Sequence, residues 1–181
     1  MADESVVESA KEPVLKLKFL SHGTLESKDL ERSRRFYTEF LGLDCVQTSK
    51  VSLMIRLGNT NTIAVVYTPR PKGEMPMLNH NGLDVLTREE VDQCYALVAA
   101  QKDKWGIKKL TKPVDQHGTR SFYFTDPDEN WWEILCNPEG GYSWMFDKGR
   151  DINQWGAGEA RCYNPNDCSL HRGQRAKTTA E

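Results

Sequence analysis

Three side chains in this sequence, His22, His80 and Glu133, are of the types that bind a first-row divalent metal. Two neutral imidazoles and one carboxylate supply three protein ligands and leave further positions open for substrate, water or dioxygen. Glu133 lies in the apolar run 130–135. A carboxylate buried there costs several kcal/mol unless it is paired or ligates a metal. The alternative is that both histidines are structural and that Glu133 pairs with a lysine or arginine.

The elements that must position these side chains occur in the same order twice. In the first half we predict a strand that ends at His22, a helix and three short strands: 14–22, 27–41, 45–48, 51–57 and 62–67. In the second half we predict the same order: 78–86, 87–105, 109–113, 119–125 and 131–136. Thr87 and Glu90 have the spacing of a capping box at the start of the second helix. A repeat of ~50 residues predicts a pseudo-symmetric α+β fold of two βαβββ modules.

Composition limits the partners and the compartment. The chain has 24 basic and 26 acidic residues and a net charge of −2, so we expect neither nucleic acid nor a membrane as a partner. Five cysteines, an odd number without a Cys-x-x-Cys pair, argue against a disulfide framework and against a thiolate zinc site. Residues 1–13 are acidic and lack an apolar core, which favours a disordered tail and a cytoplasmic protein.

The two modules divide the chain into three regions. We place the modules at 14–68 and 78–137, within one domain over 14–137. The C-terminal extension 138–181 resembles neither half. It begins with an aromatic stretch that we expect to pack on the core, and it ends in a polar stretch that we expect to be mobile.

Two stretches resemble the vicinal oxygen chelate superfamily, the group of glyoxalases, bleomycin-resistance proteins and extradiol dioxygenases. Residues 29–43, D-L-E-R-S-R-R-F-Y-T-E-F-L-G-L, resemble the family's first helix. Residues 121–133, S-F-Y-F-T-D-P-D-E-N-W-W-E, resemble its closing strand. The resemblance covers about 14–137. It implies a curved mixed sheet from paired βαβββ modules around a metal cleft, with His22, His80 and Glu133 at the ligand positions.

The sequence departs from the family at two informative positions. Aligning 61–64 with 130–133 places Ala64 where members with four protein ligands carry the fourth, and alanine cannot ligate. This argues against a site of the glyoxalase I or epimerase type. It leaves the three-ligand branch of ring-cleaving dioxygenases and fosfomycin-type thiol transferases. Glu129 stands where the family has a turn glycine.

Within that branch we favour an Fe(II) dioxygenase that cleaves a catechol-like substrate, with Mn(II) or another divalent metal as the alternative. The resemblance implies that Tyr123 contacts a substrate oxygen, and His117 is a candidate proton carrier. The alternatives are a Lewis-acid lyase or isomerase, a thiol (glutathione) transferase with Arg56 and Arg120 as anion-binding candidates, and a non-enzymatic small-molecule binding protein. We expect an aromatic or bulky apolar substrate, and a homodimer because two modules alone bury a modest core.

Overall fold

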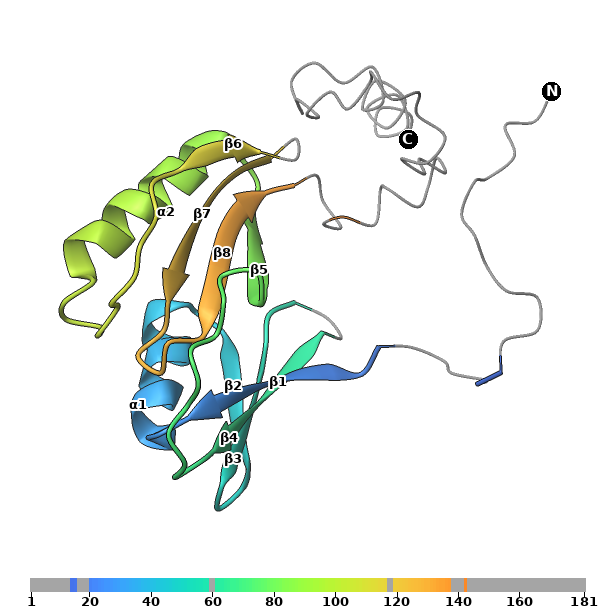
Figure 1. Ribbon diagram of the computed structural model, residues 1–181. Helices are drawn as coiled ribbons and strands as arrows, with labels where there is room; N and C mark the ends of the chain where they lie inside the picture. The colour runs from blue at the N-terminus through green and yellow to red at the C-terminus, as the bar shows by residue number, and fades with distance from the viewer. Residues whose placement is uncertain (1–13, 16–19, 59–60, 117–118, 138–141, 143–181) are drawn as a thin grey trace.

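The computed structural model describes residues 14, 15, 20–58, 61–116, 119–137 and 142. These residues form two four-stranded mixed sheets with helices, in the predicted order of two βαβββ modules (Figure 1). The α+β fold class is therefore confirmed. The predicted N-terminal tail 1–13, and the extension 138–181 apart from Tyr142, lie outside the described residues.

The first module contains four strands and one helical segment. Its elements are β1 (His22–Ser27), α1 (Leu30–Arg35), a π-helical turn (Phe36–Phe40), β2 (Asp44–Ser49), β3 (Ser52–Arg56) and β4 (Thr62–Tyr67). The strand order is β1-β4-β3-β2, with β1 parallel to β4 and the other neighbours antiparallel. Asp29 caps α1 by accepting a hydrogen bond from the backbone N–H of Arg32 at 3.0 Å. Gly42 follows the helical segment with a left-handed φ of 72°.

The second module repeats this arrangement. Its elements are β5 (His80–Val85), α2 (Arg88–Gln101), β6 (Val114–Gln116), β7 (Thr119–Thr125) and β8 (Trp131–Cys136). The strand order is β5-β8-β7-β6, and β5 is parallel to β8. The predicted capping box is confirmed. The Thr87 hydroxyl accepts from the backbone N–H of Glu90 at 3.1 Å, and the Glu90 carboxylate accepts from that of Thr87 at 3.0 Å.

Two predicted strands are wrong in position. Of the strand expected over 14–22, residues 16–19 lie outside the described residues, and β1 runs over His22–Ser27, so His22 begins this strand and does not end one. Burial explains the shift, because Leu25 and Ser27 are 5% and 0% exposed whereas Leu20 is 98% exposed. The strand expected over 109–113 contributes one isolated bridge, from Leu110 to Phe124, and the ladder forms instead at β6. Pro113 has no N–H to donate to a ladder.

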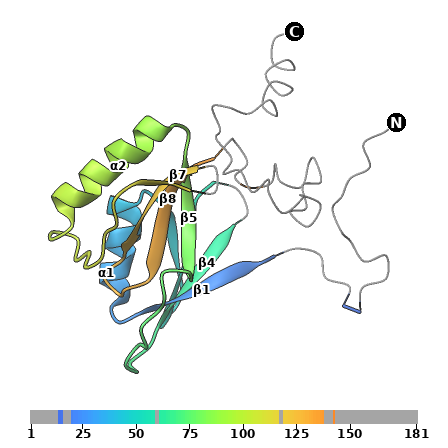
Figure 2. The ribbon, with the colours of Figure 1, turned by 45° about the horizontal axis from the view of Figure 1, so that its top comes forward.

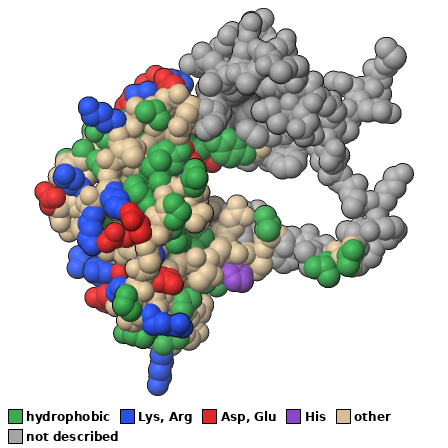
Figure 3. All heavy atoms as spheres, viewed as in Figure 1, with side chains coloured by type: hydrophobic (Ala, Val, Ile, Leu, Met, Phe, Trp, Pro, Cys, Tyr) green, Lys and Arg blue, Asp and Glu red, His purple; other side chains and the backbone are tan. Residues whose placement is uncertain are grey.

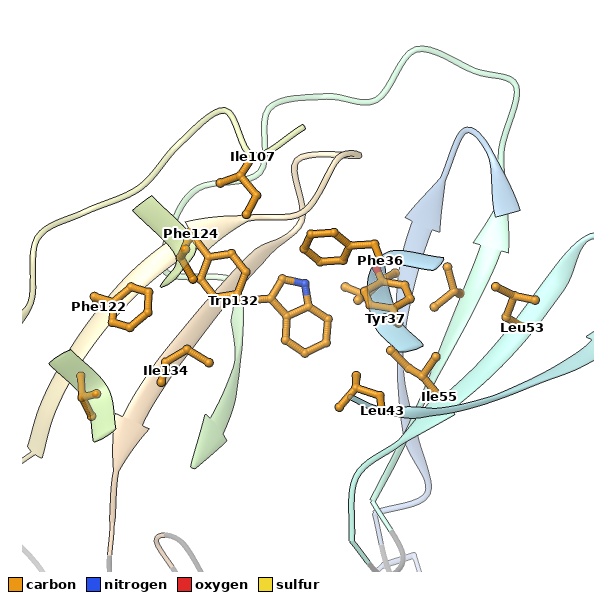
Figure 4. Packing of buried hydrophobic residues seen from close by; sticks show 14 of the residues in the cluster. Phe36, Tyr37, Leu43, Leu53, Ile55, Ile107, Phe122, Phe124, Trp132 and Ile134 are labelled. Atoms are coloured by element: carbon orange, nitrogen blue, oxygen red, sulfur yellow. The ribbon is translucent and has the colours of Figure 1, made fainter. Parts of the chain in front are cut away.

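The two modules share one hydrophobic core. Both helices lie on the same side of the sheets (Figure 2). The buried apolar side chains of both modules form one cluster. At the centre, Tyr37 from the π-helical turn packs against Trp132 of β8, with ring centroids 5.7 Å apart. Figure 4 shows Tyr37 between Trp132 on one side and Ile55 and Leu53 of the first module on the other.

A polar cluster fastens the β7–β8 turn to the first module, and we call it the turn clamp. It consists of Asp126, Asp128 and Asn130 in the turn, and of Glu26, Lys28, Arg32, Ser33 and Tyr37 in the first module. Asp128 accepts hydrogen bonds from the Arg32 guanidinium at 2.5 Å and from the Ser33 hydroxyl at 3.0 Å. Asp126 accepts one from the Tyr37 hydroxyl at 2.6 Å. The family-like motif around residue 126 thus has a structural role.

The surface agrees with the nearly balanced charge. On the face seen in Figure 3, lysine and arginine side chains are interspersed with aspartate and glutamate. Within the described part of the chain, neither helix has the length and hydropathy that crossing a lipid bilayer requires.

Candidate metal site

His80 and Glu133 meet on the face of the second sheet that points away from the helices. His80 begins β5, Glu133 lies on the neighbouring β8, and His80 Nε2 is 3.3 Å from Glu133 Oε2. Gly82 is the register partner of Glu133, so no side chain of β5 stands directly opposite the carboxylate. Glu133 is only 6% exposed. The basic side chain that faces Glu133 is thus a histidine, and not the lysine or arginine of the alternative prediction.

A backbone contact fixes the orientation of the His80 ring. His80 Nδ1 lies 2.7 Å from the carbonyl oxygen of Met77, which can only accept, so Nδ1 carries the hydrogen. In the neutral ring, Nε2 then presents its lone pair to the carboxylate. Two lone-pair donors that face each other at this distance need a cation or a proton between them. The pair fits a divalent metal, because a metal-bound histidine usually donates its other N–H to a carbonyl or carboxylate in this way.

Tyr123 completes the group on this face. It is the register partner of Glu133 between β7 and β8, and its ring lies edge-on to the His80 ring at 4.9 Å between centroids. Burial, followed by a hydrogen bond to Glu133 and by the charge of that carboxylate, raises the pKa of Tyr123 to about 12. The phenol therefore keeps its proton at neutral pH and can donate it in a hydrogen bond.

His22 lies at the matching position of the first module. It pairs with Thr62 at the start of β1 and β4, as His80 pairs with Trp131 at the start of β5 and β8. Within one chain, His22 does not join His80 and Glu133: no cluster of three or more His, Cys, Asp or Glu side chains suited to a metal occurs among the described residues. Its ring nitrogen Nδ1 contacts the Ser21 hydroxyl at 2.9 Å. The three-ligand set remains a prediction.

The strand register supports the sequence alignment of the two modules. Thr24 pairs with Ala64 in the first sheet, as Gly82 pairs with Glu133 in the second. Ala64 therefore occupies the position equivalent to Glu133. The open face of the first sheet carries no carboxylate at this point. Its cross-strand row consists of Thr24, Ala64, Met54 and Val46.

The remaining predicted site residues have other surroundings. His117 lies outside the described residues. Arg56 is paired with Asp44 at 3.0 Å, and Arg120 with Asp92 at 2.7 Å. Both arginines thus have carboxylate partners on the surface, which weakens them as anion-binding groups for a thiol transferase.

Three further residues lie near the site, Gln116, Asp84 and Tyr142, and of these only Gln116 had no signal in the sequence. Gln116 donates a hydrogen bond to the Tyr123 hydroxyl at 2.6 Å. Burial raises the pKa of Asp84, and the charge of Glu133 adds to this increase. Burial also raises the pKa of Tyr142, with smaller contributions in the same direction from Glu133 and Asp84. Tyr142 is the one residue of the extension that the structure describes, and it lies near the candidate site.

A separate cavity of about 270 Å³ lies between the modules. Its walls are mainly apolar side chains of the core, among them Leu43, Ile55, Ile63, Leu83 and Trp132. His80, Tyr123 and Glu133 are not among its lining residues. The cavity is therefore a gap in the packing between the modules and not the site that the histidine and the carboxylate define.

The fold and the His80–Glu133 contact define a protein of paired βαβββ modules with a histidine and a carboxylate facing each other on the open face of one sheet. Residues 20–134 match the sequence profile of the Glyoxalase/Bleomycin resistance protein/Dioxygenase superfamily, and the chain belongs to this superfamily. Its members are mostly enzymes and generally bind divalent metals. The resemblance inferred from the two sequence stretches is thereby confirmed.

Solved structures share this fold at low sequence identity. A glyoxalase/bleomycin resistance protein/dioxygenase from Nocardioides is 22% identical, with a TM-score of 0.53, over 71% of this chain and 89% of that one. A lactoylglutathione lyase from Agrobacterium tumefaciens is 18% identical, with a TM-score of 0.52, over 71% and 100%. A fosfomycin resistance protein from Mesorhizobium loti is 22% identical, with a TM-score of 0.50, over 68% and 95%. At these identities the likeness concerns the fold alone.

Proposed function

We propose that this protein is a metal-dependent enzyme in which His80 and Glu133 of one protomer and His22 of a second protomer hold a divalent metal. The observation that carries the proposal is the His80–Glu133 contact of 3.3 Å, with His80 Nδ1 bonded to the Met77 carbonyl. In this geometry Nε2 and the carboxylate face each other, so one cation can bind both. A buried carboxylate beside a fixed imidazole lone pair is a pair of ligands that suits a first-row metal.

The proposed homodimer follows from where the third ligand lies. His22 begins β1 and His80 begins β5, and each strand is at an edge of its sheet. An edge strand presents unpaired backbone N–H and C=O groups that a second chain can satisfy. In a twofold dimer the first module of each protomer can meet the second module of the other, which creates two equal sites.

An Fe(II) ion held by His80 and Glu133 of one protomer and His22 of the second would supply the oxidative chemistry for ring cleavage of a catechol-like substrate. The chain's own residues have three tasks. Glu133 adds a negative charge to the two neutral imidazole ligands, and this charge strengthens the binding of a cation. Tyr123, protonated at neutral pH, donates its hydrogen bond to the Glu133 carboxylate, beside the place where a substrate oxygen would bind. Met54, Ala64 and Val46 give the first sheet an open face on which an aromatic or bulky apolar ligand can pack.

The first experiment is metal analysis of protein purified without oxygen, with Glu133→Gln as the matched variant. We expect stoichiometric divalent metal in the wild type and its loss in the variant. Oxygen uptake with a panel of catechols then separates the reaction classes. Turnover of a substrate without oxygen would replace the dioxygenase by a Lewis-acid lyase or isomerase. Absence of bound metal, together with unchanged ligand binding in His22→Ala, would indicate a non-enzymatic binding protein.

Subunit mixing tests the shared site directly. His22→Ala and Glu133→Gln homodimers each lack an intact site under our proposal. When the two proteins are unfolded, mixed and refolded, half of the dimers are hybrids, and each hybrid regains one site from the intact His22 of one chain and the intact Glu133 of the other. We therefore expect about a quarter of the wild-type metal content. If all three ligands came from the same chain, mixing would restore none.

A further inference from the structure

The hydroxyl of Tyr123 accepts a hydrogen bond from a residue of the short strand β6. Gln116, the last residue of β6, places its amide nitrogen Nε2 2.6 Å from the Tyr123 hydroxyl oxygen and 3.4 Å from the Ser121 hydroxyl oxygen. Ser121 and Tyr123 lie on the same face of β7, because they are two residues apart on one strand. The amide group of Gln116 thus spans two hydroxyls that line the candidate site.

The direction of these hydrogen bonds follows from the donors and acceptors available. A tyrosine hydroxyl has one hydrogen to donate, whereas an ionised carboxylate can only accept. Tyr123 and Glu133 are register partners on adjacent strands and share a side-chain hydrogen bond, in which the phenol is the donor and the carboxylate the acceptor. The lone pair of the Tyr123 oxygen then faces Gln116, whose NH₂ group has two hydrogens, one for each hydroxyl.

We propose that Gln116 is a positioning residue that turns the hydroxyl hydrogen of Tyr123 toward Glu133 and thereby orients this carboxylate for the metal. The chain of contacts runs from Gln116 to Tyr123 to Glu133, and from Oε2 of Glu133 to His80. This inference rests on the proposed function, because it assigns the role of a residue behind the proposed metal ligands.

Outer residues of this kind usually change metal affinity by a factor of 10 to 100 when they are removed. We therefore expect Gln116→Met, which has a similar length but no N–H, to weaken Co²⁺ binding about tenfold. Gln116→Glu has the same shape but can only accept, so it should draw the Tyr123 hydrogen away from Glu133. We expect both variants to shift the visible absorption of bound Co²⁺, a signature of ligand geometry that packing alone does not move.

The experiment measures Co²⁺ affinity and absorption for the full chain in five forms: wild type, Gln116→Met, Gln116→Glu, Tyr123→Phe and the double variant Gln116→Met/Tyr123→Phe. If Gln116 acts through Tyr123, the double variant binds Co²⁺ as Tyr123→Phe does. Gln93→Met, at an exposed position of α2, is the matched control and should leave affinity and spectrum unchanged. Wild-type affinity in Gln116→Met, or losses that add in full in the double variant, would overturn the inference.

A metal-free measurement separates this inference from the proposed function. In protein without metal, the ¹³C resonance of the Glu133 carboxyl should shift in Gln116→Met and stay in place in Gln93→Met. An unshifted resonance would refute the role of Gln116 even if the wild type binds metal. A shifted resonance in a protein that binds no Co²⁺ would instead retain the orienting contact and reject the metal site.

Discussion

Replacing Tyr37 by phenylalanine tests the turn clamp at its most buried contact. The Tyr37 side chain is 1% exposed, and its hydroxyl donates to Asp126 Oδ2 at 2.6 Å. Phenylalanine keeps the ring that packs on Trp132. Asp126 keeps the Asn130 side-chain amide at 2.7 Å and two backbone N–H groups as donors. The substitution thus removes one hydrogen bond without creating a cavity.

Hydrogen bonds to charged groups contribute about 1.5–3 kcal/mol. We expect Tyr37→Phe to lower the free energy of unfolding by about 2 kcal/mol at pH 7, since Asp126 retains other donors. For a domain of this size, that loss corresponds to a decrease of roughly 4–8 °C in Tm. Urea unfolding followed by tryptophan fluorescence measures it, with Tyr67→Phe, at a position 42% exposed, as the control that should be nearly neutral.

The effect of Tyr37→Phe on the free energy of unfolding should also depend on pH. Burial, together with the charge and hydrogen bond of Asp126, raises the pKa of Tyr37 well above its usual value of 10.0. The stability that this residue contributes is complete below pH 10. Above pH 10 the unfolded chain loses the proton while the folded chain keeps it, so stability falls by about 1.4 kcal/mol per pH unit. The variant lacks this dependence.

We therefore expect the stability difference between wild type and Tyr37→Phe to shrink between pH 10 and pH 11. All other tyrosines titrate in both proteins and cancel in the comparison. A difference that stays constant from pH 7 to pH 11, or a loss below about 0.5 kcal/mol at pH 7, would show that the hydroxyl does not hold the modules together as the structure indicates.

Three further predictions concern the clamp, the turn and the metal. Asp128→Asn removes the charge that faces Arg32 and should lower the free energy of unfolding by about 1–3 kcal/mol. If the two residues interact, the double variant Asp128→Asn/Arg32→Gln should lose less stability than the sum of the two single variants. Glu129 has a left-handed φ of 62°, so Glu129→Gly should be at least about 1 kcal/mol more stable than Glu129→Val in thermal unfolding, and equal stabilities would contradict the strain. Mn²⁺ at 100 times its Kd should stabilise the wild type by about 2.7 kcal/mol in thermal unfolding, and a chelator should remove this stabilisation. Neither Mn²⁺ nor the chelator should change the stability of Glu133→Gln.

Much of the second module could be predicted from local patterns. Strands β7 and β8 have the predicted bounds because the alternating and apolar runs coincide with strands that are buried within the sheet. The Thr87 capping box is a local signal and was found where expected. Strand β1 was misplaced because its position depends on pairing with β4, which is 40 residues away at His22 and Thr62. Alternation alone could not choose between 14–22 and 22–27.

Some residues of the candidate site could likewise be predicted from the sequence, and others could not. His80 and Glu133 were predicted from their residue types and matching elements, and the structure brings them together. Gln116 could not be predicted, because a single glutamine at the end of a three-residue strand has no pattern of its own. Its role appears only when the pairing of β6 with β7 places it near Tyr123.

The turn clamp has a consequence for the order in which the chain folds during synthesis. Its contacts join residues separated by 89 to 104 positions, from Tyr37–Asp126 to Glu26–Asn130. The first module therefore leaves the ribosome long before its partners exist, with a helical segment whose polar and aromatic neighbours are still missing. Contacts between such distant residues form slowly. We expect nascent chains that end before residue 126 to remain sensitive to protease over 22–67 and to become resistant only once the β7–β8 hairpin has emerged.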